Sequence, residues 1–579
     1  MSEQSMRRLC AAALHTAVVF VLLLPCTAAA QHQAGMPPAP PRVYTTAPVG
    51  VAGAEAWRND LRTLVDALER VHPDPYAHTS KASFDSAVAV LNDSMPLLAE
   101  HRIIVGFARL LALVGDGHTS LPLYFARGVD FHVLPYRLGV YDDGVFVEAA
   151  DRAYADVVGG RVVAIGGVPV DEALARAAQL ISRDNDNWIA AVAPNLLNRI
   201  EVLHALGMTR DLASAELTVQ VVDRTLDRSL RPLPDAPRDA FGLPFLPRFT
   251  SSWVDARDAA SMPVPRYQQR FDEIYWWEWV PEQNLLYIKW DQVQNRTGGP
   301  TALTVFREAL AFAREQRPAR TVIDIRNNTG GEGGLVPAVI REIVRTREID
   351  EPGRLFVVIG RRTFSAGQMM TAMLQRFSAA IVVGEPSSAF YNGYAGHEFV
   401  HLPHSGIGIM ISPDYYQMGD YPGDPRQQAT PRLAGVPTFA DYRANRDAAL
   451  DAILAWEPDR LLHDITALLA AGDTVAAAEL IRAWNDRPVN RYRDASIDVN
   501  ALGYRVLREG RLAEALAIFE LNVRIHPHYT NGWDSLGEAY VQAGRRDDAI
   551  AAFRRALAIE PDYPPSREWL RRLGERARQ

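Results

Sequence analysis

Apolar residues at helical spacing fill the first long patterned stretch of the chain, residues 53–115. They fall into three groups: Leu61, Leu64, Val65 and Leu68; Phe84, Val88 and Leu91; Ile104, Phe107, Leu110 and Leu111. Positions three and four apart lie on one face of a helix, so the pattern predicts a cap of about three helices. We place this helical cap at residues 53–127.

Residues 128–230 change to strand-like patterning. Two apolar segments flank a turn at 142–144, and a glycine-rich stretch at 157–170 leads into a helix that starts near Asp171. This order of strand, turn, strand and helix resembles a PDZ-like module, which binds extended peptides by adding them to a sheet edge. An ordinary α/β insert fits the same pattern, and both interpretations stay open.

Strands and helices alternate through residues 285–455. The pattern predicts strands at 285–290, 321–325, 356–359 and 380–383, and helices at 301–316, 335–346 and 366–377. Strands separated by helices form βαβ units, so we expect an α/β domain with a largely parallel sheet.

The C-terminal part of the chain is repetitive. Trp533, Leu536, Gly537 and Tyr540 stand 34 residues after Val499, Leu502, Gly503 and Val506, and 34 residues is the period of the tetratricopeptide repeat. An upstream unit at 461–488 is out of strict register. Such repeats stack and present a concave surface, which serves either as a partner site or as a stabilising cap.

Length, composition and charge limit the possibilities. A chain of 579 residues is too long for one core, and roughly three to four domains are expected. The hydrophobic fraction of 48% is that of a globular protein. The net charge of −8 gives no indication of a nucleic-acid partner.

The N-terminus has the pattern of a secretory signal. Two arginines precede an apolar stretch at 10–24, and small residues follow up to Ala30, where we expect cleavage. A membrane anchor is the alternative, but the stretch is short for a span of roughly 20 residues. Lipidation at Cys26 is disfavoured because a proline precedes it. Both cysteines, Cys10 and Cys26, lie in the signal, so the mature, exported protein would have no disulfide and no cysteine-bound metal.

Ser365 is the strongest candidate for chemistry. It lies between the strand predicted at 356–359 and the helix predicted at 366–377, with small residues after it. A turn of this kind exposes the hydroxyl, and the amides at the helix start can bind an oxyanion. Serine is also a preferred N-cap residue, so the local sequence leaves both roles open.

Two further stretches carry candidate groups. The glycine-rich turn at 329–334 lacks the Gly-Lys-Ser/Thr ending of a phosphate loop, and its amides suit an oxyanion hole instead. His118 follows the last helix of the cap. A histidine there is either a surface or capping residue or a general base near neutral pH.

Four motifs in order resemble the S41 family of serine peptidases, of the tail-specific and tricorn-core type. They are Gly115-Asp-Gly-His-Thr119, Ile323-Asp-Ile-Arg-Asn-Asn-Thr-Gly-Gly331, Phe364-Ser-Ala-Gly367 and Val383-Gly-Glu-Pro386. The resemblance covers about residues 55–455. It implies a ClpP/crotonase-like catalytic core with a helical cap and a PDZ-like insert.

The resemblance also implies roles for single residues. Ser365 would be the nucleophile, and the amides of Ala366 and of Gly330 or Gly331 would form the oxyanion hole. The tail-specific branch places a lysine base soon after Val-Gly-Glu, but this chain has serines there, and we find lysines only at Lys81 and Lys289.

The tricorn-like branch uses serine and histidine instead. His118 matches the position of its base, and Asp424 is the nearest candidate for the carboxylate that orients the base. The segment around Asp424 matches the family only loosely, and Gly117 stands where tricorn has a serine.

The chain is thus expected to hold the following parts: a signal peptide at 1–30, a linker at 31–52, the helical cap at 53–127, the PDZ-like module at 128–230, an irregular connection at 231–275, the catalytic core at 276–456 and the repeats at 457–579. The expected function is that of an exported, periplasmic or secreted serine endopeptidase that acts on peptides or proteins and needs no cofactor. The alternatives are an inactive protein of the same fold that binds peptides or lipophilic ligands, and a scaffold built on the repeats.

Three histidines near residue 400 raise the alternative of a metal site. His397, His401 and His404 lie near one another in the sequence. On a strand, residues four apart share a face but lie far from each other, so we expect no metal there.

Overall fold

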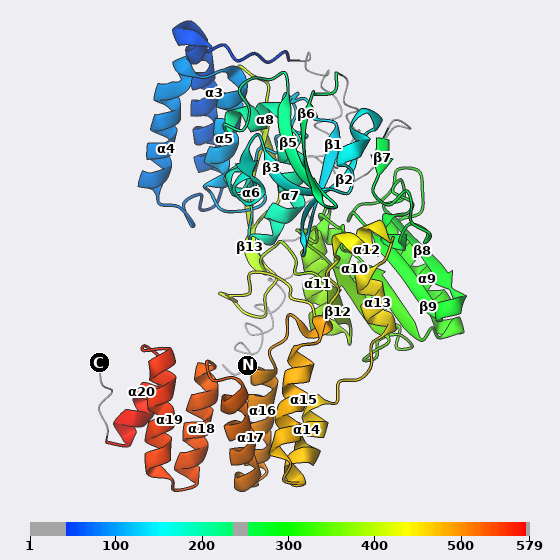
Figure 1. Cartoon of the computed structure of the whole chain (residues 1–579), viewed down its shortest axis with the longest axis vertical. Coiled ribbons are helices and arrows are strands. Elements are labelled where there is room, and N and C mark those ends of the chain that lie inside the picture. The colour runs from blue at the N-terminus through cyan, green and yellow to red at the C-terminus, as the bar shows by residue number, and fades with distance from the viewer. Residues whose placement is uncertain (1–41, 235–252, 575–579) are drawn as a thin grey trace, which may run out of the picture.

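The computed structural model describes residues 42–234 and 253–574. The predicted signal peptide, residues 31–41 of the linker and residues 235–252 of the connection lie outside these ranges. Figure 1 shows three parts along the long axis: a mixed upper part, a central sheet with helices, and a C-terminal helical array.

The upper part begins with the three helices that the sequence predicts. They are α3 (Gly50–Val71), α4 (Lys81–Ser94) and α5 (Glu100–Ala112), with the short 3-10 helix η1 (Met95–Leu97) between the last two. Ser80 caps α4 by accepting a hydrogen bond from the Ser83 amide.

An antiparallel sheet follows, with the order β1-β2-β3-β5-β6; β4 pairs with β3, and β7 pairs with β2. Its strands are β1 (Tyr136–Tyr141), β2 (Gly144–Asp151), β3 (Arg161–Ile165), β4 (Val168–Pro169), β5 (Ala215–Val221), β6 (Arg224–Leu230) and β7 (Trp253–Asp255). Its helices are η2 (Arg152–Val157), α6 (Val170–Ala178), α7 (Asn187–Leu197) and α8 (Ile200–Ala205). The strands around the turn at 142–144 are confirmed, as is the helix expected near Asp171.

One hydrophobic core unites the cap and this sheet. Side chains from α3 and α5, such as Leu64 and Phe107, belong to the same buried cluster as Val147 of β2 and Leu217 of β5. The two parts therefore bury their apolar faces against each other. A boundary at 127/128 remains a prediction, and so does the PDZ-like character of the sheet.

The central sheet has the order β17-β12-β11-β10-β9-β8, and all neighbouring pairs are parallel except β8 with β9 at the edge. Its strands are β8 (Tyr275–Val280), β9 (Leu285–Trp290), β10 (Arg320–Asp324), β11 (Leu355–Ile359), β12 (Ile381–Gly384) and β17 (Leu433–Ala434). Its helices are η3 (Arg266–Gln268), η4 (Pro281–Gln283), α9 (Ala302–Gln316), η5 (Gly333–Leu335), α10 (Val336–Arg345), α11 (Ala366–Phe377), α12 (Phe439–Arg443) and α13 (Ala448–Leu454). The predicted alternation and the largely parallel sheet are confirmed.

Both faces of this sheet are covered, which explains its continuous apolar strands. Every residue of β9 and of β11 is buried. Helices α9, α10 and α11 pack on one face, and α13 packs on the other. The carboxyl ends of parallel strands meet at one edge, which is where open α/β sheets place ligands.

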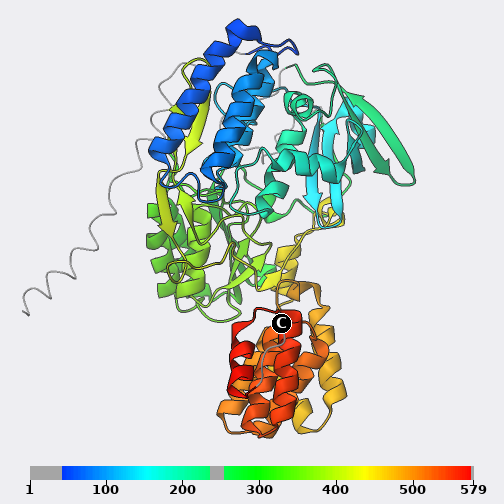
Figure 2. The ribbon, with the colours of Figure 1, turned by 90° about the vertical axis from the view of Figure 1, so that its left-hand side faces the viewer.

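Two small ribbons after the sheet reach back to the upper part. They are β13 (Asn392–Ala395) with β16 (Asp414–Gln417), and β14 (Glu398–His401) with β15 (Gly408–Ile411). Figure 2 shows yellow-green strands of this segment beside the blue helix α3. Ile409 and Ile411 enter the upper core, and Met410 exchanges two backbone hydrogen bonds with Ser120. The segment around His118 is thereby tied to a segment that follows Ser365 in the chain.

The C-terminal array consists of α14 (Leu461–Ala470), α15 (Thr474–Asn485), η6 (Pro488–Asn490), α16 (Ala495–Arg508), α17 (Leu512–Ile525), α18 (Thr530–Gln542), α19 (Arg546–Ile559) and α20 (Pro564–Arg572). Gly503 and Gly537 show why the repeat keeps its glycine. A Cβ atom at either position would lie 2.5 or 2.6 Å from the ring of Phe519 or Phe553, so the paired helices need glycine to approach this closely.

None of the helices in residues 42–234 and 253–574 has the length and apolar character that a membrane span requires.

Candidate active site

Ser365 occupies a strained position between β11 and α11. Its backbone has φ 50° and ψ −123°, a conformation that favours glycine. It stands at the N-cap position of α11, but its side chain makes no capping hydrogen bond. The capping role that the local sequence allowed is therefore wrong. A strained residue whose hydroxyl caps nothing is characteristic of functional sites.

The turn before Ser365 is fixed by its neighbours. Thr363 donates its hydroxyl hydrogen to the carbonyl of Ile325 at 2.9 Å, and the Phe364 amide donates to the carbonyl of Asn328 at 3.0 Å. These bonds join the end of β11 to the end of β10. These two hydrogen bonds therefore help to keep the Ser365 backbone in its strained conformation.

Gly330 lies directly against Ser365. A Cβ atom at Gly330 would lie 2.5 Å from the Ser365 Cβ, 2.9 Å from its Oγ and 3.0 Å from the Ala366 nitrogen. Its φ of 107° is also a glycine conformation. No larger residue fits between the glycine-rich turn and the serine.

The candidate donors to an oxyanion, as the sequence predicts them, are the amides of Ala366 and of Gly330 or Gly331. Ala366 is the first residue of α11, where an amide has no partner within the helix. The Gly330 amide already donates to Asn328 Oδ1 at 2.9 Å. Gly331 forms a parallel bridge with Val293, in which the Val293 amide donates to the Gly330 carbonyl and the Glu332 amide donates to the Val293 carbonyl. The amide of Gly331 itself therefore points away from Val293. Gly331 is thus the better of the two predicted glycine donors.

His118 lies beside the turn that carries Ser365, stacked on Phe364. The two ring centroids are 4.5 Å apart, and Trp188 stacks on the same phenylalanine at 5.1 Å. Neither ring nitrogen of His118 has a partner with hydrogen-bond geometry, and among the bonds of the described residues none joins His118 to Ser365.

Burial keeps the His118 imidazole neutral. It lowers the pKa of His118 to about 3, and nearby His397 lowers it further, while Asp116 and the Tyr394 carbonyl oppose the shift. His118 is therefore neutral at neutral pH, but a pKa this far below neutrality makes the buried imidazole a weak proton acceptor, since a general base works best with a pKa near the operating pH.

Asp116 is the carboxylate that lies beside His118. Its Oδ1 accepts the backbone amides of His118 and Thr119, both at 2.7 Å, and its Oδ2 is 2.9 Å from His72 Nε2. Burial alone would raise the pKa of Asp116, but the His72 bond and the nearby His118 bring it down to about 2. Asp116 belongs to the motif quoted from the sequence, but a role in holding the histidine segment was not predicted.

Asp424 does not occupy the predicted place. Its carboxylate forms an ion pair with Arg426 at 2.6 Å and accepts the Asp420 amide at 3.0 Å. The Arg426 hydrogen bonds hold the pKa of Asp424 well below its usual range. No contact in the described part of the chain joins it to His118 or Ser365, so the predicted orienting role has no support in the structure.

The two lysines are engaged elsewhere. Lys289 is fully buried in β9, with its Nζ 2.6 Å from Asp291 Oδ2, and Lys81 pairs with Glu69 and Asp85 on the surface. Within residues 42–234 and 253–574, neither ammonium contacts Ser365.

Residues 184–188 of the upper part connect the two halves of the site. Asp184 Oδ1 accepts the Gly117 amide at 2.7 Å, and its Oδ2 accepts the Phe390 amide at 3.1 Å. Four residues later, Trp188 packs on Phe364. One turn therefore holds the histidine segment beside the serine segment. No motif in the sequence indicated this role.

The Asp184 carboxyl gives a prediction about stability and pH. Burial raises the pKa of Asp184 to about 7, with the two amides opposing this and Asp116 adding to it. Between about pH 4 and pH 7, Asp184 is protonated in the folded chain but ionised in the unfolded chain. The free energy of unfolding therefore decreases as pH rises through this range, by at most about 1.4 kcal/mol per pH unit, because the folded chain must hold Asp184 ionised at a cost.

Asp184→Asn removes this titration. We expect the unfolding free energy of the variant, minus that of the wild type, to increase from pH 4 to 7 and to level off above pH 8. Urea denaturation at several pH values measures the difference. A difference that falls or stays flat over this range would contradict the raised pKa.

Gln368, in the first turn of α11, is fully buried, and neither polar atom of its side chain has a hydrogen-bond partner, which is uncommon in native structures. His397 lies 5.3 Å from the His118 ring, and His404 packs on Trp57. In the described ranges, no group of three or more His, Cys, Asp or Glu side chains is arranged to hold a metal.

Comparisons with known proteins add the following. The tetratricopeptide repeat family matches residues 530–563, which confirms the predicted repeat there. No curated protein matches the sequence.

Solved structures of proteases are similar to the chain at low identity. Mature CPAF complexed with lactacystin is 12% identical with a TM-score of 0.45, over 68% of this chain and 96% of that one. The photosystem II D1 C-terminal processing protease is 15% identical with a TM-score of 0.30, over 69% and 96%. The putative S41 protease from Bacteroides fragilis NCTC 9343 is 11% identical with a TM-score of 0.27, over 60% and 85%.

One of these neighbours is described as a putative S41 protease, the family that the four motifs resemble. These superpositions are too weak to assign any residue, so the roles of Ser365 and His118 rest on the geometry of this chain.

Proposed function

We propose that the chain is a serine peptidase that forms an acyl-enzyme on Ser365. The strained Ser365 backbone, with a hydroxyl that caps nothing at the start of α11, carries the proposal. Gly330 packs against Ser365 and the Ala366 amide at the start of α11, and the His118 ring is stacked on the preceding residue, Phe364; these contacts support the proposal.

The reaction would begin when Ser365 Oγ attacks a peptide carbonyl. The hydroxyl proton goes to the His118 imidazole, and the carbonyl oxygen becomes an oxyanion that accepts hydrogen bonds from the Ala366 and Gly331 amides. The carbon–nitrogen bond then breaks, and the imidazolium gives its proton to the leaving amine. Water, deprotonated by the same imidazole, releases the acyl group and restores Ser365.

The domain organisation and the cellular location form part of the same proposal. We propose a helical cap at 53–127, a PDZ-like module at 128–230 and a catalytic core at 276–456, exported after removal of residues 1–30. The repeats at 457–579 would bind a protein partner.

A second candidate function is ligand binding without catalysis. It is favoured by one observation: the His118 ring is stacked on Phe364 and makes no hydrogen bond to Ser365. A protein that had lost catalysis would have no need to bring these two groups together.

Labelling with a fluorophosphonate separates the two functions. The peptidase proposal expects the wild type to be labelled at Ser365, located by mass spectrometry of the modified peptide. His118→Ala should slow labelling by about 10²- to 10⁴-fold, which is the usual contribution of a general base. Asp424→Asn is the matched control and should label at the wild-type rate.

The outcomes are distinct. Absence of labelling in folded wild-type protein would support the binding function. Labelling at Ser365 that is indifferent to His118→Ala would keep the nucleophile and refute the base.

A further inference from the structure

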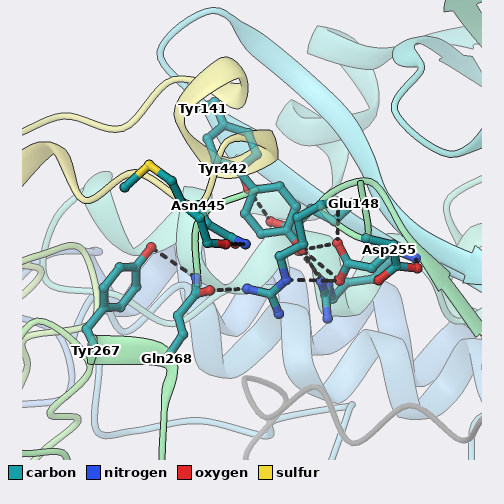
Figure 3. A network of polar contacts seen from close by, with 11 residues as sticks. Tyr141, Glu148, Asp255, Tyr267, Gln268, Tyr442 and Asn445 are labelled. Atoms are coloured by element: carbon teal, nitrogen blue, oxygen red, sulfur yellow. Dashed lines mark hydrogen bonds and ion pairs between the residues drawn. The ribbon is translucent and has the colours of Figure 1, made fainter. Parts of the chain in front are cut away.

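Two carboxylates of the C-terminal array have no cationic partner. In the polar network of Figure 3, by contrast, Glu148 and Asp255 both pair with Arg137. None of the ion pairs formed within residues 42–234 and 253–574 includes Asp534 or Glu538 of α18. These two residues are four positions apart on one helix, so their side chains lie on the same face of α18.

Hydrogen bonds join this face of α18 to the first helices of the neighbouring pairs, α16 and α20. Glu538 accepts the Tyr504 hydroxyl of α16 at 2.7 Å and the Trp569 Nε1 of α20 at 2.9 Å. Asp534 accepts the Ser566 hydroxyl of α20 at 2.5 Å. The three helices, labelled in Figure 1, therefore present one continuous row of polar groups.

Asn500 adds to this row an acceptor that has no donor. Its side chain is buried, and its Nδ2 donates to Ser535 Oγ at 3.0 Å, which directs the side chain to the residue after Asp534. Its Oδ1 has no hydrogen-bond partner. Asn500 stands one repeat of 34 residues before Asp534, so the two occupy equivalent positions of neighbouring repeats. A buried carbonyl oxygen of this kind requires a donor from outside the chain, either a water molecule or a ligand.

The charge of the row favours a cation as its occupant. Burial raises the pKa of Asp534 to about 6, and the negative charge of Glu538 adds to the shift. At pH 7 both carboxyls are mostly ionised, so the row holds two negative charges close together. Arg572 lies over the Trp569 ring but pairs with Glu568. A cation bound beside Asp534 would lower the free-energy cost of its buried charge.

The row also suits an occupant that donates several hydrogen bonds and accepts none. The lysine ammonium and the arginine guanidinium are such groups. Tyr504, Glu538 and Trp569 are only half-buried, so the row can be reached from solvent. Over the described ranges, no group of three or more His, Cys, Asp or Glu side chains is arranged to hold a metal, so an organic cation fits the row better than a metal ion.

We propose that the row formed by Asn500, Asp534 and Glu538 binds a lysine or arginine side chain of a protein partner. The inference rests on the proposed binding of a partner by the repeats, and it names the chemistry of that partner: an exposed basic segment. The cationic group would donate charge-assisted hydrogen bonds to the two carboxylates and a further one to the Asn500 carbonyl oxygen.

Peptides of matched length test the charge preference. The protein is the full chain with Ser365→Ala, so that the probes stay intact. The probes are the fluorophore-labelled peptide Ala-Lys-Ala-Lys-Ala amide and its analogues with glutamine or glutamate in place of both lysines, followed by fluorescence anisotropy at about 0.15 M salt, where distant charges are screened. We expect the lysine peptide to bind about ten- to a hundredfold more tightly than the glutamine peptide, the range for a hydrogen bond to a charged group. The glutamate peptide should not bind.

Two double variants locate the binding. Asp534→Asn with Glu538→Gln should reduce binding of the lysine peptide to the level of the glutamine peptide. Glu479→Gln with Asp547→Asn removes the same charge from exposed residues of α15 and α19 and should leave binding unchanged. Should the first pair fail to fold, Glu538→Gln alone, at a half-buried position, should weaken binding by about tenfold. Full binding in the folded variants of the row, or equal binding of the lysine and glutamine peptides, would overturn the proposal.

The outcomes also separate this inference from partner binding in general. Tighter binding of the glutamine or glutamate peptide would refute the cationic chemistry and leave the repeats as a peptide-binding array. If none of the three peptides binds, the inference fails. Selection of displayed random peptides on the same protein then tests partner binding by the repeats independently of charge.

Discussion

Replacing Ser365 by alanine or by glycine is expected to abolish peptide hydrolysis, while the two variants differ in stability. Both lack the proposed nucleophile, and loss of a catalytic serine lowers kcat by about 10⁶-fold. Alanine keeps a Cβ atom at φ 50° and ψ −123°, whereas glycine adopts this conformation freely. We therefore expect Ser365→Gly to be more stable than Ser365→Ala by about 1–2 kcal/mol.

Chemical denaturation of the two variants measures this difference. Ser378 provides the matched control, because it follows α11 with an extended backbone at φ −133°. There the order should reverse, with glycine less stable than alanine by about 0.5–1 kcal/mol. Equal stability of the two Ser365 variants would show that the backbone at the nucleophile is unstrained. Hydrolysis by either variant at the wild-type rate would refute Ser365 as the nucleophile.

Replacing Gly330 by alanine is expected to cause the second largest loss. The added Cβ would lie 2.5 Å from the Ser365 Cβ and 3.0 Å from the Ala366 nitrogen, and φ 107° strains any side chain. The serine or the glycine-rich turn must then move, which displaces the oxyanion donors. We expect kcat/KM to fall by at least about 10²-fold and the fold to lose about 1–3 kcal/mol.

Gly334→Ala is the matched control, since it lies four residues later in the same turn with no atom within 4 Å of the new Cβ. It should hydrolyse peptides and unfold as the wild type does. Wild-type activity in Gly330→Ala would exclude close packing of this turn against the nucleophile. Equal losses in both variants would mean that the turn tolerates no side chain, irrespective of Ser365.

Part of the environment of Ser365 can be predicted from the local sequence, and part of it cannot. The strand before Ser365 and the helix after it follow from apolar periodicity, so the sequence predicts a serine on a strand-to-helix turn. The choice between cap and nucleophile depends on the backbone angles and on the free side chain. Contacts with Ile325 and Asn328 impose these angles, and both residues are distant in the chain.

Asp424 and Asp184 illustrate the opposite case. Asp424 is predicted because it lies after Ser365 in a segment that loosely matches the family, but in the structure its carboxylate forms an ion pair with Arg426. Asp184 lies in no motif, yet it accepts amides from Gly117 and Phe390, which are far apart in sequence. A carboxylate pairs with the donors that lie near it in the folded structure, and these cannot be identified from the order of residues in the sequence.

The sequence by itself determined the alternation of the central sheet, the three cap helices, the repeat with its period, and the serine turn, because each depends on spacing between near neighbours. Only the tertiary structure decided that the cap and the neighbouring sheet share one core, that Gly330 touches Ser365, and that His118 stacks on Phe364. These features arise where segments that are not local neighbours in the chain pack together, and packing depends on the whole chain rather than on local periodicity.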